Sequence, residues 1–244
     1  QYNMGFYRGP NIVTDGLVFV MDPASERSYP GSGTTVDSVV GSHVGSLSNG
    51  VGFTTDNAGG FVFDGVDDGI SFPYDSIFQM DTNSTIEIIF KCDVALTNST
   101  DLRRTLFSNA ASNSFGLEIG SFANCSINST VGNRFLIHRQ GNCFSAVSLA
   151  NAWTPGDICC FTYTRNASRV DKMYVNGLEI TLQQGNGYTF ASGGTNASTF
   201  GIRQGLSGGQ RFDGNIYRTS FYSKALSAAE VAQNFNAQKS RFGL

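Results

Sequence analysis

Apolar and polar residues alternate along several parts of the chain, and this pattern predicts β-strands. The clearest case is residues 85–93, where every second residue from Ile86 to Cys92 is apolar and Glu87 and Lys91 lie between them. Side chains of a strand point alternately to opposite faces of the sheet, so a period of two separates two faces. We therefore expect one face of this strand to lie in the core and the other to face water.

Shorter runs of the same kind recur along the chain, separated by residues that form turns. They lie at residues 105–108, 115–119, 134–138, 158–164, 172–175, 179–182, 200–203 and 215–222. Two earlier segments, 11–22 and 60–72, also place apolar runs directly against Gly and Asp. Between the fifth and sixth runs stands Asn176-Gly177, the dipeptide of a two-residue type I′ hairpin, so these two runs should pair as antiparallel strands. Many short strands with turns between them predict a β-sandwich or a barrel.

A single helix is predicted near the C-terminus, over about residues 228–238. It begins with a capping box, in which the Ser227 hydroxyl can accept a hydrogen bond from the Glu230 amide. Val231 and Phe235 lie one turn apart and should anchor the helix to a sheet. We expect this helix to close the sandwich and to carry no chemistry.

The composition fits a single all-β domain. With 244 residues the chain can bury one substantial core, and sandwiches of this size are commonly one domain. Only 14% of the residues are charged, whereas 29 Gly supply turn positions and 20 Phe supply core volume. The formal net charge of -3, with no basic stripe, argues against binding to nucleic acid. No apolar run approaches the roughly 20 residues that a membrane-spanning helix needs.

The start of the chain is set apart from the strand pattern. It contains the aromatic side chains Tyr2, Phe6 and Tyr7 but shows no sustained periodicity. Terminal arms are often frayed, although aromatic ones can dock onto a neighbour. We therefore divide the chain into an N-terminal arm, residues 1–13, and a sandwich domain, residues 14–244, and take the three aromatic side chains as candidate partner-binding residues.

Four motifs, in this order and spacing, resemble the concanavalin A-like jelly-roll superfamily and, within it, the laminin-G-like group. They are Phe63-Asp-Gly-Val-Asp-Asp68 before a strand, Trp153 leading into Cys160-Phe-Thr-Tyr163, Met173-Tyr-Val-Asn-Gly177, and Phe212-Asp-Gly-Asn-Ile216 leading to the helix. The resemblance covers residues 11–240. It implies an all-β fold, an antiparallel jelly-roll β-sandwich with a short C-terminal α-helix.

A narrower resemblance concerns the two ends of the chain. Residues 11–18, 29–35 and 233–242 look like stand-alone laminin-G-like proteins of tailed phages, especially phages of aquatic bacteria, in which they are structural virion proteins. This resemblance implies a capsid decoration or a tail or fibre component, with the arm attached to another virion protein or to a symmetry mate. It also implies contact with host or environmental glycans, but no particular ligand. The alternative is a free lectin that binds carbohydrate, secreted or displayed on a cell surface.

The superfamily also contains glycoside hydrolases, and the sequence argues against this activity. Those enzymes resemble one another in a Glu-x-Asp-x-x-Glu run that places two carboxylates about 5–5.5 Å apart. The Glu residues of this chain have no such companion, since Glu87 and Asp93 share a face but lie roughly 20 Å apart along the strand. A nucleophilic triad is not expected either, because His43 and His138 are the only histidines and no Gly-x-Ser-x-Gly elbow exists. We predict a protein without enzymatic activity, and a glycan hydrolase is the least favoured function.

Asp64, Asp67 and Asp68 are the candidate metal ligands. The laminin-G-like resemblance implies Ca²⁺ at a rim of the sandwich, and carboxylate oxygens suit that ion. The same residues are also good turn formers without any metal, because each Asp run is followed by Gly. The sequence leaves both interpretations open, favours turn formation, and requires no cofactor.

The five cysteines show no metal-binding spacing, because they form neither a C-x-x-C pair nor a cluster with His. We expect buried thiols that act as small apolar side chains. A disulfide between Cys125 and Cys143 is the alternative. Cys159 and Cys160 are adjacent and should point to opposite faces if they lie in a strand.

Two single side chains have both a functional and a structural interpretation. Trp153 could stack on a sugar ring, but the family resemblance implies a core or strand-edge residue. His138 follows an alternating run and is expected to be a satisfied sheet residue. Neither defines a site by itself.

Overall fold

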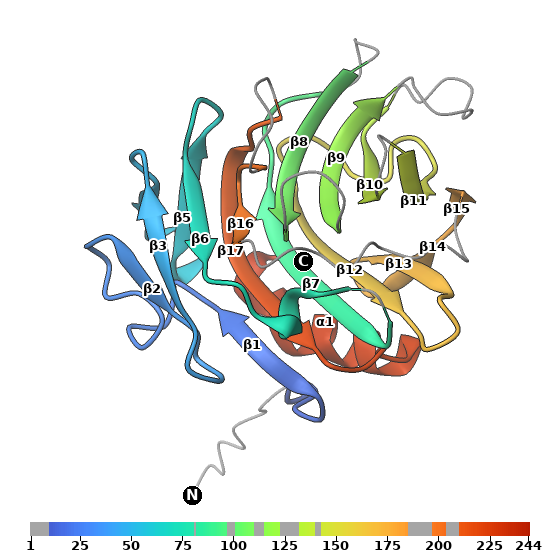
Figure 1. Ribbon diagram of the computed structural model, residues 1–244, viewed down its shortest axis with the longest axis horizontal. Coiled ribbons are helices and arrows are strands. Elements are labelled where there is room, and N and C mark those ends of the chain that lie inside the picture. The colour runs from blue at the N-terminus through green and yellow to red at the C-terminus, as the bar shows by residue number, and fades with distance from the viewer. Residues whose placement is uncertain are drawn as a thin grey trace, which may run out of the picture.

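Two antiparallel β-sheets pack face to face, and one helix lies on the outside of one of them (Figure 1). The computed structural model describes residues 10–80, 82–96, 101–109, 115–122, 132–139, 143–184, 197–203 and 210–244. The architecture confirms the predicted all-β sandwich with a C-terminal helix. No described helix is long and apolar enough to cross a membrane.

The first sheet has eight strands and contains both the first and the last strand of the chain. Its order is β14-β13-β12-β7-β17-β5-β4, and β1 pairs with β17. Its strands are β1 (Leu17–Met21), β4 (Gly52–Thr54), β5 (Gly60–Asp64), β7 (Ser84–Lys91), β12 (Ile158–Arg165), β13 (Asp171–Val175), β14 (Leu178–Ile180) and β17 (Asp213–Tyr222).

The second sheet has nine strands, in the order β15-β11-β10-β9-β8-β16-β6-β3-β2. They are β2 (Thr35–Asp37), β3 (Val44–Ser48), β6 (Gly69–Phe72), β8 (Asp101–Ser108), β9 (Gly116–Phe122), β10 (Arg134–Arg139), β11 (Cys143–Ser148), β15 (Leu182–Gln184) and β16 (Ser198–Phe200). Two short 3-10 turns, η1 (Asp56–Ala58) and η2 (Ser76–Phe78), lie between strands.

The predicted Asn176-Gly177 hairpin is confirmed. Its two residues have positive φ angles of 49° and 79°, as a type I′ turn requires, and Val175 pairs with Leu178 across the turn. After β14 the chain crosses to the other sheet and continues there as β15. The single strand predicted at residues 179–182 is therefore two short strands in different sheets.

Phenylalanine rings from both sheets fill most of the space between them. Phe107 of β8 meets Phe221 of β17 edge to face, with ring centroids 5.0 Å apart. Phe135 of β10 stacks on Phe161 of β12 at 3.9 Å. Trp153 is 4% exposed and belongs to the same cluster, so its prediction as a core residue is confirmed.

Three cysteines are buried free thiols, as predicted for them. Cys159 packs between the sheets and Cys160 packs on the opposite face of the first sheet, so the two neighbours point in opposite directions. Burial raises the pKa of the Cys92 thiol to about 11, which keeps it protonated at neutral pH. Cys125 and the side chain of Cys143 lie outside the described residues, and a bridge between them stays a prediction.

Strand β7 differs from its sequence prediction, because both of its faces are buried. Ile86 and Phe90 face the core between the sheets, as predicted. The opposite face, predicted to be wet, carries Glu87, which is 2% exposed, and Ile89, which is 1% exposed. Helix α1 (Ala228–Phe242) covers this face, so the prediction of a wet face is wrong. Alternation separates the two faces of a strand but does not reveal what covers each of them.

Helix α1 begins with the predicted capping box and ends at Phe242, beyond the predicted end near residue 238. The Ser227 hydroxyl accepts from the Glu230 amide at 3.3 Å, and Glu230 Oε2 accepts from the Ser227 amide at 2.8 Å. The buried side chains recur every three or four residues and therefore form one helix face toward the sheet. They are Val231, Asn234, Gln238 and Phe242.

Removal of the cap is expected to weaken this packing. Ser227→Ala leaves the Glu230 amide without its acceptor, and loss of such a cap costs about 1 kcal/mol of unfolding free energy. Denaturant unfolding should show the loss. Ser240→Ala makes the same chemical change at an exposed position of the same helix and should be neutral or slightly stabilising, because Ala is the better helix former. Equal effects of the two substitutions would contradict the role of the cap.

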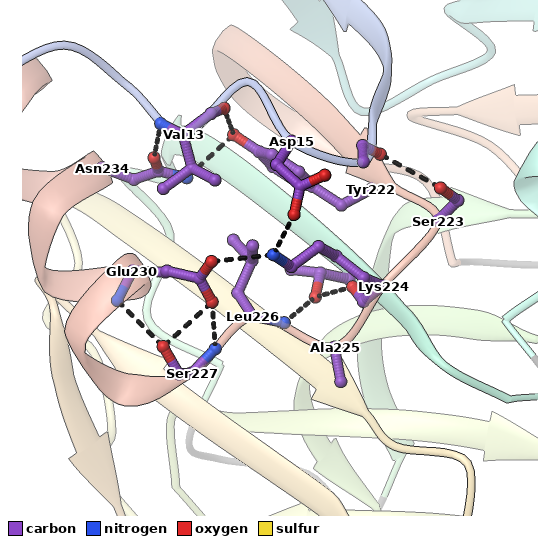
Figure 2. A network of polar contacts seen from close by, with 12 residues as sticks. Val13, Asp15, Tyr222, Ser223, Lys224, Ala225, Leu226, Ser227, Glu230 and Asn234 are labelled. Carbon is purple, nitrogen blue, oxygen red and sulfur yellow. Dashed lines mark hydrogen bonds and ion pairs between the residues drawn. The ribbon is translucent and has the colours of Figure 1, made fainter.

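The N-terminal segment is docked onto α1 and β17 (Figure 2). The Val13 amide donates to Asn234 Oδ1 at 2.8 Å, and the Tyr222 hydroxyl donates to the Val13 carbonyl at 3.1 Å. Lys224 Nζ lies 2.6 Å from Asp15 Oδ2. These contacts join two ends of the chain that are far apart in sequence.

The docked segment includes the last residue that the sequence assigns to the arm. Val13, which the sequence assigns to the arm, is 8% exposed and held by the contacts just described. Residues 1–9, with the candidate partner-binding side chains Tyr2, Phe6 and Tyr7, lie outside the described residues. The partner-binding role of these three residues stays a prediction.

Candidate functional site

Of the three candidate metal ligands, Asp64 is the last residue of β5, and Asp67 and Asp68 lie in the turn that leads to β6. Asp64 Oδ1 accepts a hydrogen bond from the Val66 amide at 2.7 Å. Asp68 Oδ2 accepts from the Asp64 amide at 2.9 Å. Both aspartates therefore shape the turn through their side chains, as Asp does in Asx turns.

The same turn also gathers three carboxylates into one cluster. One oxygen from each of Asp64, Asp67 and Asp68 lies within 4.8 Å of the others. Asp68 is 3% exposed, and its Oδ1 has no hydrogen-bond partner among the described residues. Burial, followed by the charges of Asp64 and Asp67, raises the pKa of Asp68. The cluster fits Ca²⁺, because oxygen ligands at 2.3–2.6 Å from one ion lie up to about 5 Å apart.

A bound Ca²⁺ ion would stabilise the native state, since a ligand that binds only the folded protein raises its stability. We expect millimolar Ca²⁺ to raise the melting temperature of the wild-type protein and not that of Asp67→Asn. Asp67 is the suitable position, because Asp64 and Asp68 also form the turn. Without Ca²⁺ the variant should melt at the wild-type temperature or slightly above it, because it removes one of three neighbouring negative charges. A melting temperature that Ca²⁺ leaves unchanged would identify the aspartates as turn formers only.

A second group of polar side chains crosses five strands of the nine-stranded sheet. The Cα partners along β2, β3, β6, β16 and β8 all carry small hydroxyl side chains, and the row spans roughly 19 Å at the usual strand spacing. They are Thr35, Ser46, Ser71, Thr199 and Ser108. Paired residues on adjacent strands point to the same face of the sheet. Here this is the outer face, because the neighbouring residues Phe72, Phe107 and Phe200 point to the opposite face and belong to the core. The row is exposed at Ser46 and buried at Thr199.

Farther along this outer face, Glu118 of β9 lies between two guanidinium groups. Arg103 Nη1 is 3.1 Å from Glu118 Oε2, and Arg203 Nη1 is 3.2 Å from Glu118 Oε1. Leu117 and Ile119 point into the core, so Glu118 points outward. All three charged side chains are buried. Burial lowers the pKa of Arg203, and the negative charge of Glu118 opposes this shift.

A third arginine, Arg134, lies at the start of β10 on the same face, because the next residue, Phe135, faces the core. Its side chain is 6% exposed, and burial lowers its pKa. Nη1 donates to the Ser148 carbonyl and to Gln183 Oε1, both at 2.7 Å. We call the hydroxyl row together with Arg103, Glu118, Arg203 and Arg134 the outer polar face.

The carboxylates considered for catalysis are separated by the fold. Glu87 lies beneath α1, and Asp93 pairs with Lys91 at 2.9 Å. Glu230 caps α1, and Glu118 lies between two arginines. Each of these groups is engaged in a structural contact.

His43 lies beside a carboxylate and two aromatic rings. His43 Nδ1 lies 3.5 Å from Asp75 Oδ2, and its ring packs near Phe19 and Phe78. His138 belongs to β10, but its side chain lies outside the described residues. The interpretation of His138 as a satisfied sheet residue stays a prediction.

Sequence reasoning missed the outer polar face. The alternation of Leu117, Glu118 and Ile119 places Glu118 opposite the core and could have identified this single residue. The hydroxyl row has no such signal, because its members are small residues from five strands whose register only the fold sets.

A laminin G family model, described as the concanavalin A-like lectin/glucanases superfamily, matches residues 63–232. This range contains the acidic turn, all the charged residues of the outer polar face and the start of α1. No curated protein matches the sequence.

Solved structures show the same fold at low sequence identity. Trypanosoma rangeli sialidase, solved with sialic acid, is 14% identical with a TM-score of 0.65, and the match covers 96% of this chain and 35% of the sialidase. Domain 4 of AbnA, a GH43 extracellular arabinanase of Geobacillus stearothermophilus, was solved with arabinotriose. It is 13% identical with a TM-score of 0.64, and the match covers 90% of this chain and 98% of that domain. The botulinum neurotoxin serotype D binding domain is 16% identical with a TM-score of 0.65, and the match covers 92% of this chain and 52% of the toxin domain. This chain is thus similar to part of the sialidase and of the toxin domain, and to nearly all of the arabinanase domain.

Proposed function

The chain belongs to the concanavalin A-like lectin/glucanases superfamily, and from this premise we propose that it is a non-enzymatic, glycan-binding structural protein of a phage virion. The observation that carries the binding function is the contrast between the two sheets. Helix α1 seals the outer surface of the eight-stranded sheet over β7, whereas the nine-stranded sheet turns hydroxyl and charged side chains outward. The accessible end of this face, at the exposed Thr35 and Ser46 and the half-buried Ser71, offers both donors and acceptors to saccharide hydroxyls.

The similar structures support the same function. The arabinanase domain, which this chain matches over 98% of that domain, was solved in complex with arabinotriose, and the sialidase was solved with sialic acid. Both descriptions concern those proteins, and the match to them is one of fold. They make a saccharide the first ligand class to test.

The absence of catalysis is proposed from the position of Glu118. A retaining or inverting glycosidase needs one carboxyl group that gives up a proton and a second that acts as nucleophile or base. Glu118 accepts from a guanidinium group on each of its two oxygens. Both oxygens are therefore engaged in structural contacts, which is unlike the arrangement that a glycosidase acid or nucleophile needs.

The virion role rests on the resemblance of residues 11–18, 29–35 and 233–242 to structural proteins of tailed phages. The first and last of these segments touch each other, since Gln233 Nε2 donates to the Asn11 carbonyl at 2.8 Å. The arm would leave the sandwich beside α1 and bind another virion protein or a symmetry mate. The alternative is a free secreted or cell-surface lectin.

Glycan binding can be tested on an array of immobilised saccharides. We expect the wild-type protein to bind, and Ser46→Gln/Ser71→Gln, which adds bulk to the outer polar face, to lose binding. Leu178→Gln, at the 74% exposed hairpin tip of the other sheet, should bind like wild type. Equal binding by all three proteins would place the site elsewhere, and no binding by wild type would refute the function. Release of reducing ends would overturn the non-enzymatic part of the proposal.

The virion role needs a separate experiment. Deletion of residues 1–9, which leaves Val13 in its docked position, should preserve the fold and abolish incorporation into particles. Unchanged incorporation would remove the role of the arm. A protein that never associates with particles but binds glycans would be the free lectin.

A further inference from the structure

Arg134 is a buried charge without an anionic partner among the described residues. Its contacts are the Ser148 carbonyl and the Gln183 amide oxygen, both neutral acceptors of Nη1. Nε is buried and has no hydrogen-bond partner in the part of the chain that the structure describes. Arg134 is only 6% exposed. Its guanidinium group nevertheless carries a positive charge, because arginine remains protonated in proteins.

This arrangement is costly in the protein alone. Buried charges are normally paired, because removing an ion from water is unfavourable and neutral hydrogen bonds offset this only in part. The other two arginines of the outer polar face, Arg103 and Arg203, share the carboxylate of Glu118. Arg134 has no such carboxylate among its described contacts.

The contact with Gln183 places Arg134 next to the exposed edge of the sheet. The cross-strand partner of Arg134 on β9 is Gly120, which has no side chain to cover the arginine. Gln183, on the edge strand β15, is exposed. Nη1 already donates to two acceptors and Nε is buried, so Nη2 is the part of the guanidinium group left to donate to the oxygens of an external carboxylate or sulfate group.

We propose that Arg134 binds the anionic group of an acidic saccharide, a carboxylate or a sulfate ester, at the β10–β15 end of the outer polar face. This inference rests on the proposed glycan binding and names its ligand class. The bound anion would supply the missing counter-charge, and the neighbouring polar side chains would contact the neutral part of the saccharide.

The test uses an array that pairs acidic saccharides with the same saccharides lacking the acid, such as sialyllactose with lactose and a sulfated galactan with its desulfated form. We expect wild-type protein to bind the acidic members at least tenfold more tightly, with the preference falling as salt rises. The carboxylated and sulfated arms show which anion is preferred.

The decisive variant is Gln183→Glu, which places a carboxylate where a neutral oxygen now lies 2.7 Å from Arg134 Nη1. It should raise the melting temperature and abolish the preference for acidic saccharides, because the counter-charge is now internal. Leu178→Glu adds the same charge at the hairpin tip of the other sheet and should keep the preference.

Three outcomes would overturn the inference. Equal binding of acidic and neutral members by wild type would remove the anion and leave the proposed glycan binding intact. An unchanged preference in Gln183→Glu would place the anion away from Arg134. No binding to any saccharide would refute the proposed function and this inference together.

Discussion

Replacement of Arg165 by Met is expected to lower the free energy of unfolding by about 3–5 kcal/mol, the usual cost of breaking a buried ion pair. Arg165 ends β12 and faces Asp171 at the start of β13, and both side chains are fully buried. Arg165 Nη1 lies 2.6 Å from Asp171 Oδ1, and the Tyr163 hydroxyl donates to the same oxygen at 2.6 Å. Methionine fills a similar volume but leaves the carboxylate without its guanidinium group. At roughly 2–4 °C per kcal/mol for a domain of this size, thermal unfolding should show a fall of roughly 6–20 °C.

Two further variants separate charge from packing. Lys172→Met breaks the ion pair with Glu179, which is about half exposed on both sides, and should cost at most about 1 kcal/mol. The double substitution Arg165→Met/Asp171→Leu removes both buried charges and should recover part of the loss, but not all of it, because the Tyr163 hydroxyl also loses its acceptor. A single Arg165→Met variant as mild as Lys172→Met would show that the buried pair contributes little.

The fold was largely predictable, because its determinants are local. The period of two in β7, the positive-φ turn at Asn176-Gly177 and the capping box at Ser227 each act within a few residues. The errors come from contacts between distant segments. Glu87 was predicted to face water, because its strand contains no signal that a helix more than a hundred residues later covers this face. Residues 179–182 were predicted as one strand because the sequence does not show the crossing between sheets.

The candidate site was less predictable for the same reason. The acidic turn could be found, because Asp64, Asp67 and Asp68 lie within five consecutive residues. The outer polar face could not, since it depends on register between strands drawn from many parts of the chain. Arg134 in particular is an ordinary strand residue until the fold buries it without a carboxylate among its described neighbours.

The helix that seals one sheet also buries a carboxyl group. Glu87 Oε1 accepts from Gln238 Nε2 of α1 at 2.8 Å. Glu87 Oε2 and Gln238 Oε1 are both buried with no hydrogen-bond partner among the described residues, and both are acceptors. A proton on Glu87 supplies the donor that they lack. Around this group lie Asn234 of α1, Thr162 and Cys160 of β12, and Tyr222 and Arg218 of β17, and only Arg218 brings a positive charge.

Glu87→Gln is therefore expected to stabilise the protein increasingly as the pH rises. Burial raises the pKa of Glu87 in the folded state above its ordinary value of 4.5, so its stabilising effect is full below that pH and is lost as the pH rises toward the folded value. Gln keeps a donor toward Gln238 and cannot ionise. The variant should melt like wild type below pH 4.5 and at a higher temperature than wild type above it, with a gap that widens as the pH rises. Glu179→Gln, at an exposed carboxyl group, is the control in the same thermal series. A Glu87→Gln variant that is less stable at every pH would show instead that an ionised Glu87 stabilises the fold through Arg218.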